Sequence, residues 1–163
     1  MLKLIKCEFL KLKRKKFIPL IILAAFLFPI PLTYLMTTPS MMERYTDRAD
    51  AFDGLFNMVL GYGIQFLLPC IIGVIAAILF FMERDNDTFK NLRTIPVTST
   101  QMVLAKIIVL FLFGIVFCVA STIATILCGF GTLEVYGIGY KLFLAVETGI
   151  FITAGTLLSL IHI

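Results

Sequence analysis

The side chains that could do covalent or metal chemistry are few in this sequence and lie far apart. The only histidine is His162, so no histidine-based metal site or catalytic triad can be assembled. The phosphate-binding loop G-x-x-x-x-G-K-[ST] is absent as well. Four cysteines form no C-x-x-C pair and lie in or beside apolar stretches, where a cysteine is most often a small buried residue: Cys7, Cys70, Cys118 and Cys128. The sequence therefore predicts no enzyme, no metal site and no cofactor, and any use of ATP needs another polypeptide.

Glu147 is the only acidic residue in the apolar stretch Leu142–Ile163. A carboxylate that faces hydrocarbon is unfavourable by about 3 kcal/mol at the centre of a bilayer, and by less toward its edges. We therefore expect Glu147 to face another helix or an aqueous pocket rather than lipid. Two roles stay open for it. One is contact with a cationic or polar substrate, and the other is a structural position near the outer interface, within reach of water or Lys141.

The segment Glu83–Pro96 has the residue types of a protein-docking element. We expect Asp87–Ile95 to form a short helix, which must end before the proline because the preceding residue disfavours α geometry. Phe89 and Leu92 then share one face of this helix. Charged side chains surround that pair: Arg84, Lys90 and Arg93. Glu83, at the start of the segment, is a further candidate for the docking site. An apolar centre with a charged rim is typical of a protein interface. The alternative is a solvated connection whose Phe89 returns to the bilayer.

The N-terminal segment 2–15 has the periodicity of an amphipathic helix. Apolar residues recur at spacings of three and four residues: Leu2, Ile5, Phe9 and Leu12. Cations that include Lys11 and Arg14 lie largely on the other side. This pattern predicts a helix in the membrane interface, with its cations toward anionic headgroups. The alternative is a solvated basic tail.

The elements that must position these residues follow from the composition. Of the 163 residues, 60% are apolar and 15% are charged, whereas soluble domains have about 25% charged residues. About 20 apolar residues cross a hydrocarbon core of ~30 Å as a helix. Four spans are predicted at about residues 17–36, 57–82, 102–128 and 142–163. The expected fold is an all-α integral membrane protein, with residues 1–163 as a single membrane domain.

Lysine and arginine counts in the short flanks predict the orientation of these spans. The N-terminal flank and the segment 83–106 contain eleven cations: Lys3, Lys6, Lys11, Lys13, Arg14, Lys15, Lys16, Arg84, Lys90, Arg93 and Lys106. The other two connections contain three: Arg44, Arg48 and Lys141. We therefore expect a multi-pass cell-membrane protein with a cytoplasmic N-terminus. This asymmetry explains the net charge of +4 without a nucleic-acid partner.

Prolines and small residues predict details of the helices. Pro29 and Pro31 are expected to kink or end the first span, and Pro69 to bend the second. Small residues one turn apart allow close helix approach in lipid. They occur as Gly73-x-x-x-Ala77, Ala120-x-x-x-Ala124 and Gly155-x-x-x-Ser159.

The order of these features resembles the ABC-2 type permeases, particularly the subunits of lantibiotic immunity and bacitracin-resistance exporters. The closest resemblance is F-K-N-L-R-T-I-P-V-T at Phe89–Thr98, followed by Ala105-Lys106 at the start of the third span. The resemblance implies a non-enzymatic permease subunit with two protein partners. These are a cytoplasmic ABC ATPase and a second permease subunit, in a homo- or heterodimer. Six spans are usual in that family, and no Lys or Arg follows the fourth span here, so we expect an N-terminal part of a six-span permease.

Two other functions remain open at this stage. One is a small non-transporting membrane protein that binds a toxin or scaffolds a membrane complex. The other is an ATP-independent transporter, which usually has ionisable groups near the midplane of the membrane. The basic segment and the apolar run that follows it, within the first 36 residues, also resemble a signal peptide. Pro19 and Pro29 interrupt the apolar run, however, and no clear small-x-small cleavage site follows, which argues against cleavage.

Overall fold

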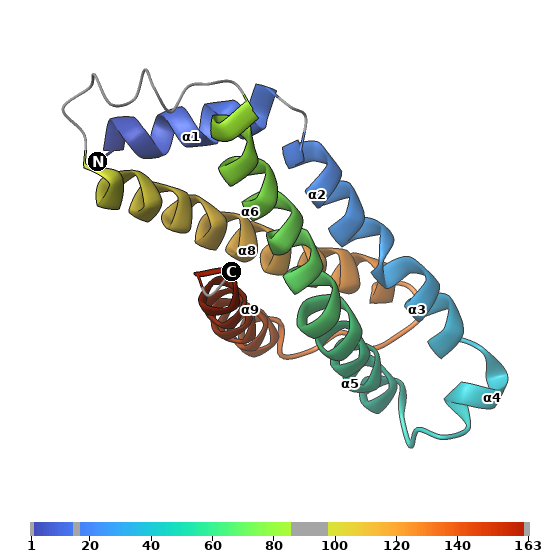
Figure 1. The fold of residues 1–163 in the computed structure, drawn as a ribbon. Coiled ribbons are helices and arrows are strands. Elements are labelled where there is room, and N and C mark those ends of the chain that lie inside the picture. The colour runs from blue at the N-terminus through green and yellow to red at the C-terminus, as the bar shows by residue number, and fades with distance from the viewer. Residues whose placement is uncertain (1, 15–16, 86–97, 162–163) are drawn as a thin grey trace.

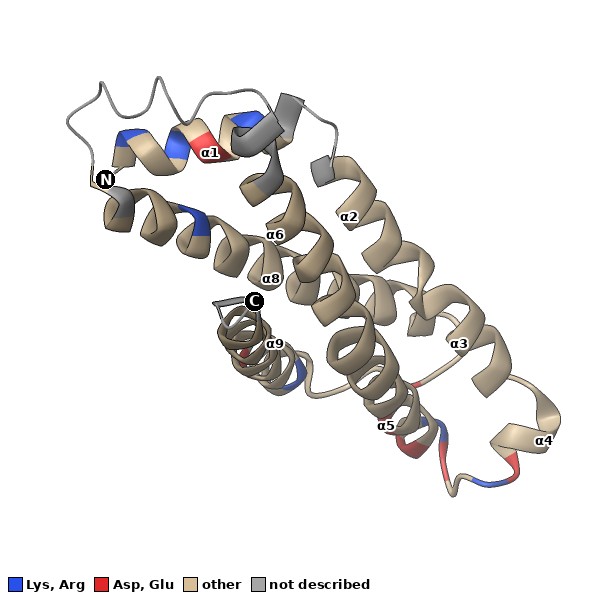
Figure 2. Cartoon of the chain, viewed as in Figure 1, with Lys and Arg blue, Asp and Glu red and all other residues tan. Residues whose placement is uncertain are grey.

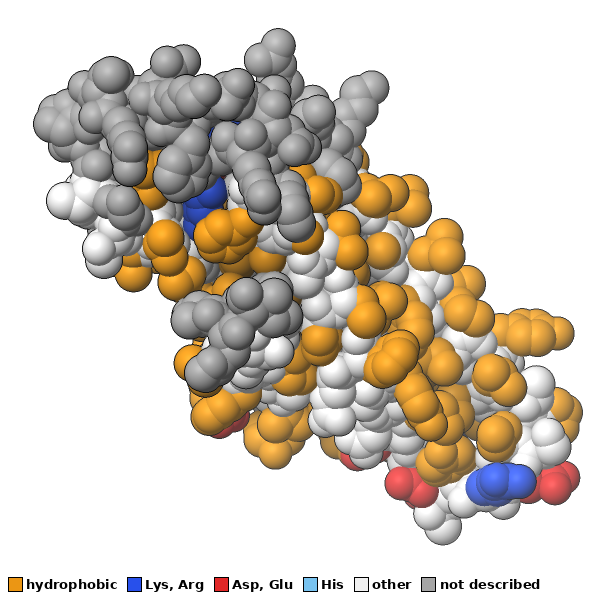
Figure 3. Space-filling view, viewed as in Figure 1, with side chains coloured by type: hydrophobic (Ala, Val, Ile, Leu, Met, Phe, Trp, Pro, Cys, Tyr) orange, Lys and Arg blue, Asp and Glu red, His pale blue; other side chains and the backbone are white. Residues whose placement is uncertain are grey.

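The computed structural model describes residues 2–14, 17–85 and 98–161, and every regular element in these ranges is a helix (Figure 1). This confirms the predicted all-α membrane fold. Within the described ranges, four helical stretches are long and apolar enough to cross a membrane: Pro19–Met36, Arg48–Phe80, Thr100–Gly129 and Ile138–Ser159. Apolar side chains cover the visible face of these stretches, and the charged side chains that can be seen lie mainly toward its ends (Figure 3).

The first span consists of two helices, α2 (Phe17–Leu27) and α3 (Pro29–Met36). Phe28 separates them, and Pro29 begins α3 because a proline lacks the N–H that would continue the ladder of α2. The hydroxyl of Thr33 donates to the carbonyl oxygen of Pro29 at 2.8 Å. The break expected at Pro29 is therefore present.

The second span is a continuous run of α5 (Arg48–Met58), the π-helix η1 (Val59–Leu67) and α6 (Leu68–Asp85). A short helix, α4 (Pro39–Met42), connects the first span to it. The π-helix ends directly before Leu68-Pro69. A proline cannot donate to the carbonyl four residues earlier, and wider turns are one way to accommodate that loss. The irregularity before Pro69 is thus a π-helix, and the predicted bend stays a prediction.

The third and fourth spans are α8 (Ser99–Gly129) and α9 (Ile138–Ile161), which pack closely along their length. Glycines make this approach close. A Cβ atom at Gly114 would lie 2.6 Å from the hydroxyl oxygen of Thr153, and one at Gly149 would collide with the sulfur of Cys118. These two contacts fix the distance between the helices.

The amphipathic helix α1 (Leu2–Arg14) lies across the end of the bundle at which α2 begins and α6 ends, and it packs against α8 and α2 (Figure 1). We call this end the α1 end, and the opposite end, where α4 lies, the α4 end. The main buried apolar cluster joins α1, α2, η1, α6, α8 and α9. A second cluster at the α4 end includes Met36, Phe52 and Leu133.

Candidate functional site

The predicted docking residues flank or lie within the connection from α6 to α8 at the α1 end. Phe89, Lys90, Leu92 and Arg93 lie outside the described residues. Glu83 belongs to the last turn of α6, and only its backbone is described. The structure therefore describes the two helix ends that carry this connection.

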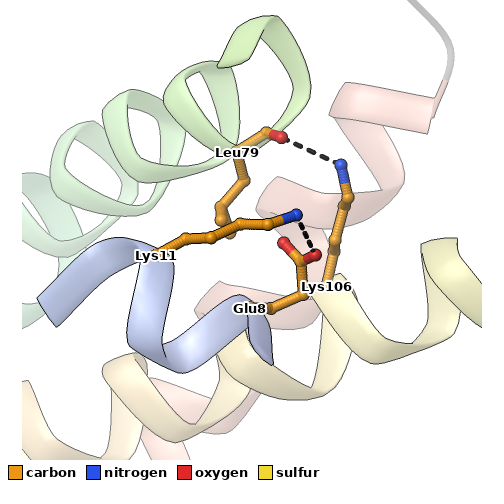
Figure 4. A network of polar contacts seen from close by, with 4 residues as sticks. All are labelled: Glu8, Lys11, Leu79 and Lys106. Carbon is orange, nitrogen blue, oxygen red and sulfur yellow. Dashed lines mark hydrogen bonds and ion pairs between the residues drawn. The ribbon is translucent and has the colours of Figure 1, made fainter. Parts of the chain in front are cut away.

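Lys106 holds these two helix ends together. It lies in the second turn of α8, and only 2% of its surface is exposed. Its ammonium group donates to the carbonyl oxygen of Leu79 in α6 at 2.9 Å and lies 4.8 Å from the centre of the Phe80 ring (Figure 4). A buried cation that binds a backbone carbonyl and an aromatic face is costly to displace. Lys106 therefore fastens the start of α8 to the end of α6.

Glu8 adds α1 to this cluster. Glu8 is 5% exposed, and one carboxylate oxygen forms an ion pair with the ammonium group of Lys11 at 2.6 Å. The other oxygen is buried without a hydrogen-bond partner among the described residues. Figure 4 shows the side chains of Glu8 and Lys106 beside one another, between α1, α6 and α8. We call Glu8, Lys11 and Lys106 the inner polar cluster.

One part of the predicted apolar stripe of α1 packs against the helix bundle, and another part is exposed. Leu12 is fully buried, Ile5 packs against the main core, and the ring of Phe9 stacks on Phe113 of α8 with centres 5.8 Å apart. Leu2 is 84% exposed. Of the two predicted cations, Lys11 pairs with Glu8, and the side chain of Arg14 is not described. Part of the stripe therefore docks α1 on the bundle.

A second polar cluster, at the α4 end, was not predicted from the sequence. Lys141 is 5% exposed; its ammonium group lies 2.6 Å from a carboxylate oxygen of Asp53 and donates to the carbonyl oxygen of Tyr136 at 3.1 Å. The rings of Tyr136 and Phe52 lie 4.0 and 5.1 Å from the ammonium group. We call Asp53, Tyr136 and Lys141 the outer polar cluster. The one sequence feature that could have indicated this cluster was Lys141, a lone lysine at the start of the fourth span.

Tyr136 also donates its hydroxyl hydrogen to Asp53. This hydrogen bond, together with the negative charge of Asp53, raises the pKa of Tyr136 above its usual value of 10.0. The neutral tyrosine is thus the form that the folded protein favours, and the contact is intact at neutral pH. The outer polar cluster therefore holds the α8–α9 connection against the middle of α5.

Glu147 is exposed on α9 and forms no hydrogen bond or ion pair with another described residue. Gly149, two residues further along α9, packs against Cys118 of α8 and near Leu68, the first residue of α6. Glu147 is nine residues beyond the start of α9, because this helix begins at Ile138, before the predicted start of the span. Lys141 is engaged by Asp53 instead of Glu147.

Chemistry within the described residues is limited to these clusters. No group of three His, Cys, Asp or Glu side chains there could hold a metal ion. A groove of about 260 Å³ between α2 and α6 has an apolar lining that includes Leu20, Cys70 and Val74. Such a lining offers no polar group to orient a substrate, so the polar clusters at the two ends are the better guide to function.

Comparison with known proteins adds one match. A family model described as ABC-2 family transporter protein matches residues 4–163, which is nearly the whole chain. Neither the curated proteins nor the solved structures give a significant match.

Proposed function

Because the chain belongs to the ABC-2 family of transporter proteins, it is a membrane permease subunit of an ABC exporter, and we propose that it couples to its ATPase through the connection between α6 and α8. An ABC-2 permease is not itself the ATPase. Energy from ATP must therefore reach the spans by mechanical contact with a separate subunit. Phe89 and Leu92 form the apolar centre of that contact, with Arg84, Lys90 and Arg93 around it and Glu83 beside it.

The single observation that supports this proposal is the attachment of both ends of the connection to one rigid base. Lys106 of α8 binds the Leu79 carbonyl of α6, and α1 packs on α8. A force applied to the 86–97 segment would then move α6 and α8 together. A connection between two loosely packed helix ends would lose that force in local bending.

In this proposal α1 lies in the cytoplasmic interface of the cell membrane. Lys3 and Lys6 are exposed, as headgroup-binding cations must be, and Leu2 and Leu10 are exposed apolar residues that can enter the lipid. The part of the stripe that packs on α8 keeps α1 beside the ATPase-docking segment. We propose that the N-terminus lies on the cytoplasmic side, with the docking segment.

The resemblance of the Phe89–Lys106 stretch to lantibiotic immunity and bacitracin-resistance subunits favours antimicrobial peptides or antibiotics as the exported molecules. A second permease subunit completes the pathway in this proposal.

The docking proposal predicts different effects for two neighbouring substitutions. Phe89→Ala removes an aromatic side chain from the interface centre, which commonly weakens binding by about 2 kcal/mol or more, whereas Lys90→Ala removes a rim charge that matters less. We therefore expect roughly thirtyfold weaker retention of the ATPase by Phe89→Ala, and a change of no more than a few fold for Lys90→Ala. Co-purification of the ATPase with each variant from detergent-solubilised membranes measures this.

The control is membrane insertion, which both variants should retain at the wild-type level. Equal retention of the ATPase by Phe89→Ala and the wild-type protein would contradict the proposal and reduce this segment to a solvated connection. The alternative of a non-transporting scaffold cannot explain a Phe89→Ala variant that inserts into the membrane but no longer retains the ATPase.

A further inference from the structure

The contact of α1 with the bundle is not centred on the apolar stripe of this helix. Leu12 is fully buried and Glu8 is nearly so, whereas the exposed fraction of Phe9 is 38%. Leu2, the other end of the stripe, is exposed as well. At about 100° per residue, the centre of burial lies between Leu12 and Glu8, roughly 60° from the centre of the stripe. Helix α1 is therefore rotated toward its glutamate.

Hydrophobic burial alone does not explain this rotation. A contact centred on the stripe would cover more of Phe9 and would bring Glu8 closer to the edge of the contact. A buried carboxylate is costly unless charges or hydrogen bonds compensate it. One oxygen of Glu8 is buried without a hydrogen-bond partner among the described residues, which adds to this cost. An attraction to Glu8 has to offset both effects.

That attraction has to come from another helix. Lys11 pairs with Glu8 at 2.6 Å, but both residues belong to α1 and turn with it, so their ion pair cannot set the rotation of the helix. Lys106 of α8 is almost fully buried, and its side chain lies beside that of Glu8 (Figure 4). In poorly hydrated surroundings, an ammonium group attracts a carboxylate strongly even without direct contact. Lys106 is itself held by the Leu79 carbonyl oxygen of α6.

We propose that Glu8 is a positioning residue for coupling to the ATPase, and that its attraction to Lys106 fixes the rotation of α1 against the start of α8. The proposal rests on the proposed docking role of the α6–α8 connection. Because Lys106 also holds α6, one buried cation orders the ends of three helices beside that connection. Helix α1 then follows α6 and α8 when the ATPase moves them, instead of rolling along its apolar stripe.

Spin-label distances in the full chain, reconstituted in lipid nanodiscs, test the fixed rotation. One label is placed on the exposed Cys7 of α1 and the other on Thr100→Cys, an exposed position in the first turn of α8, with the remaining cysteines replaced. We expect one narrow distance distribution when Glu8 is present. Glu8→Gln keeps the size of the side chain and removes its charge. It should widen the distribution at least about twofold, because several rotations of α1 then have similar free energies.

Two further substitutions separate charge from packing. Glu8→Asp keeps the charge and should remain much closer to the wild-type width than Glu8→Gln. Glu8→Leu makes the centre of the contact apolar, so packing alone predicts a distribution as narrow as the wild-type one. The proposal predicts a wide distribution instead, because several rotations then bury similar apolar areas. Glu43→Gln, at an exposed position near α4, is the matched control and should change nothing.

Coupling is measured in the chain co-purified with its ATPase, before and after nucleotide is trapped with vanadate. In the wild-type complex, the distance between the labels on α1 and α8 should stay the same, since the two helices move together. In Glu8→Gln, this distance should change on trapping while the ATPase is still retained. A second label pair, Thr100→Cys and Tyr140→Cys, joins α8 to α9 and should be unaffected by Glu8→Gln if the bundle is intact.

Three results would overturn the proposal. They are a Glu8→Gln or Glu8→Leu distribution as narrow as the wild-type one, a wide distribution in the wild-type chain, and a wild-type distance that changes on trapping. Each can occur while Phe89→Ala still loses the ATPase. Conversely, the nanodisc distances require no ATPase, so the fixed rotation can be confirmed even if Phe89→Ala retains it.

Discussion

Two lysines within apolar helices show how this protein accommodates charge. Lys106 and Lys141 lie near opposite ends of the bundle, and both are almost fully buried. Each donates to a backbone carbonyl and lies against aromatic rings. Lys141 also pairs with the carboxylate of Asp53. Because a buried ammonium group is costly without such partners, each lysine fixes the elements around it in one arrangement.

At this scale we predict that Lys141→Met destabilises the folded protein. Methionine fills similar space but cannot bind Asp53 or the Tyr136 carbonyl, so two charge-assisted contacts are lost. Since Asp53 is partly exposed and can be hydrated, we expect a loss of about 2 kcal/mol. The midpoint of thermal unfolding of the detergent-purified chain measures this. Lys6→Met, at an exposed position of α1, is the control. An unchanged midpoint for Lys141→Met would mean that the outer polar cluster contributes nothing to stability.

The packing of the helices depends on glycines other than those in the predicted small-residue motifs. Ala120 and Ala124 are buried as expected. At Gly73 and Gly155, however, a Cβ atom would meet no described residue within 4 Å, so the prediction was wrong for these two contacts within the described chain. Gly114 and Gly149 bring α8 and α9 together instead. Spacing identified small residues correctly but did not identify the side of the helix that a neighbour covers.

A matched pair of substitutions tests this packing. Gly149→Leu forces α9 away from Cys118 of α8, and overpacking of this kind typically costs about 1–3 kcal/mol. Gly73→Leu adds the same side chain where no described residue lies against it. We expect a lower unfolding midpoint for Gly149→Leu and a nearly unchanged one for Gly73→Leu in the purified chain. Equal midpoints would show that the α8–α9 contact does not limit stability.

At the scale of the whole molecule, the two ends differ in charge. Acidic residues gather near α4 and the start of α5, whereas α1 at the other end has several cations (Figure 2). Lysines and arginines close to short spans are retained on the cytoplasmic side. The α1 end is therefore the proposed cytoplasmic end, the side on which an ATPase can act.

Cysteine labelling in intact cells tests this orientation. Ser40 is exposed at the α4 end, and Ser99 begins α8 at the α1 end. In a chain without native cysteines, we expect an impermeant maleimide to label Ser40→Cys but not Ser99→Cys. Lysed cells, in which both sites should react, are the control. Labelling of Ser99→Cys alone in intact cells would reverse the topology.

The sequence by itself determined the class of the protein and the role of its spans. Four uncharged apolar stretches of this length indicate membrane-spanning helices. The lack of a phosphate-binding loop can also be read from the sequence alone. The break between α2 and α3 was also predictable from the local sequence, because it depends on the single N–H that Pro29 lacks.

The tertiary structure decided which side of each helix is covered. It buried Leu12 but exposed Leu2, directed Lys141 to Asp53, and turned Glu147 outward. Rotation of a helix depends on its neighbours, and η1, with its wider turns, shifts the facing of every residue beyond it. Periodicity along one segment cannot supply that information.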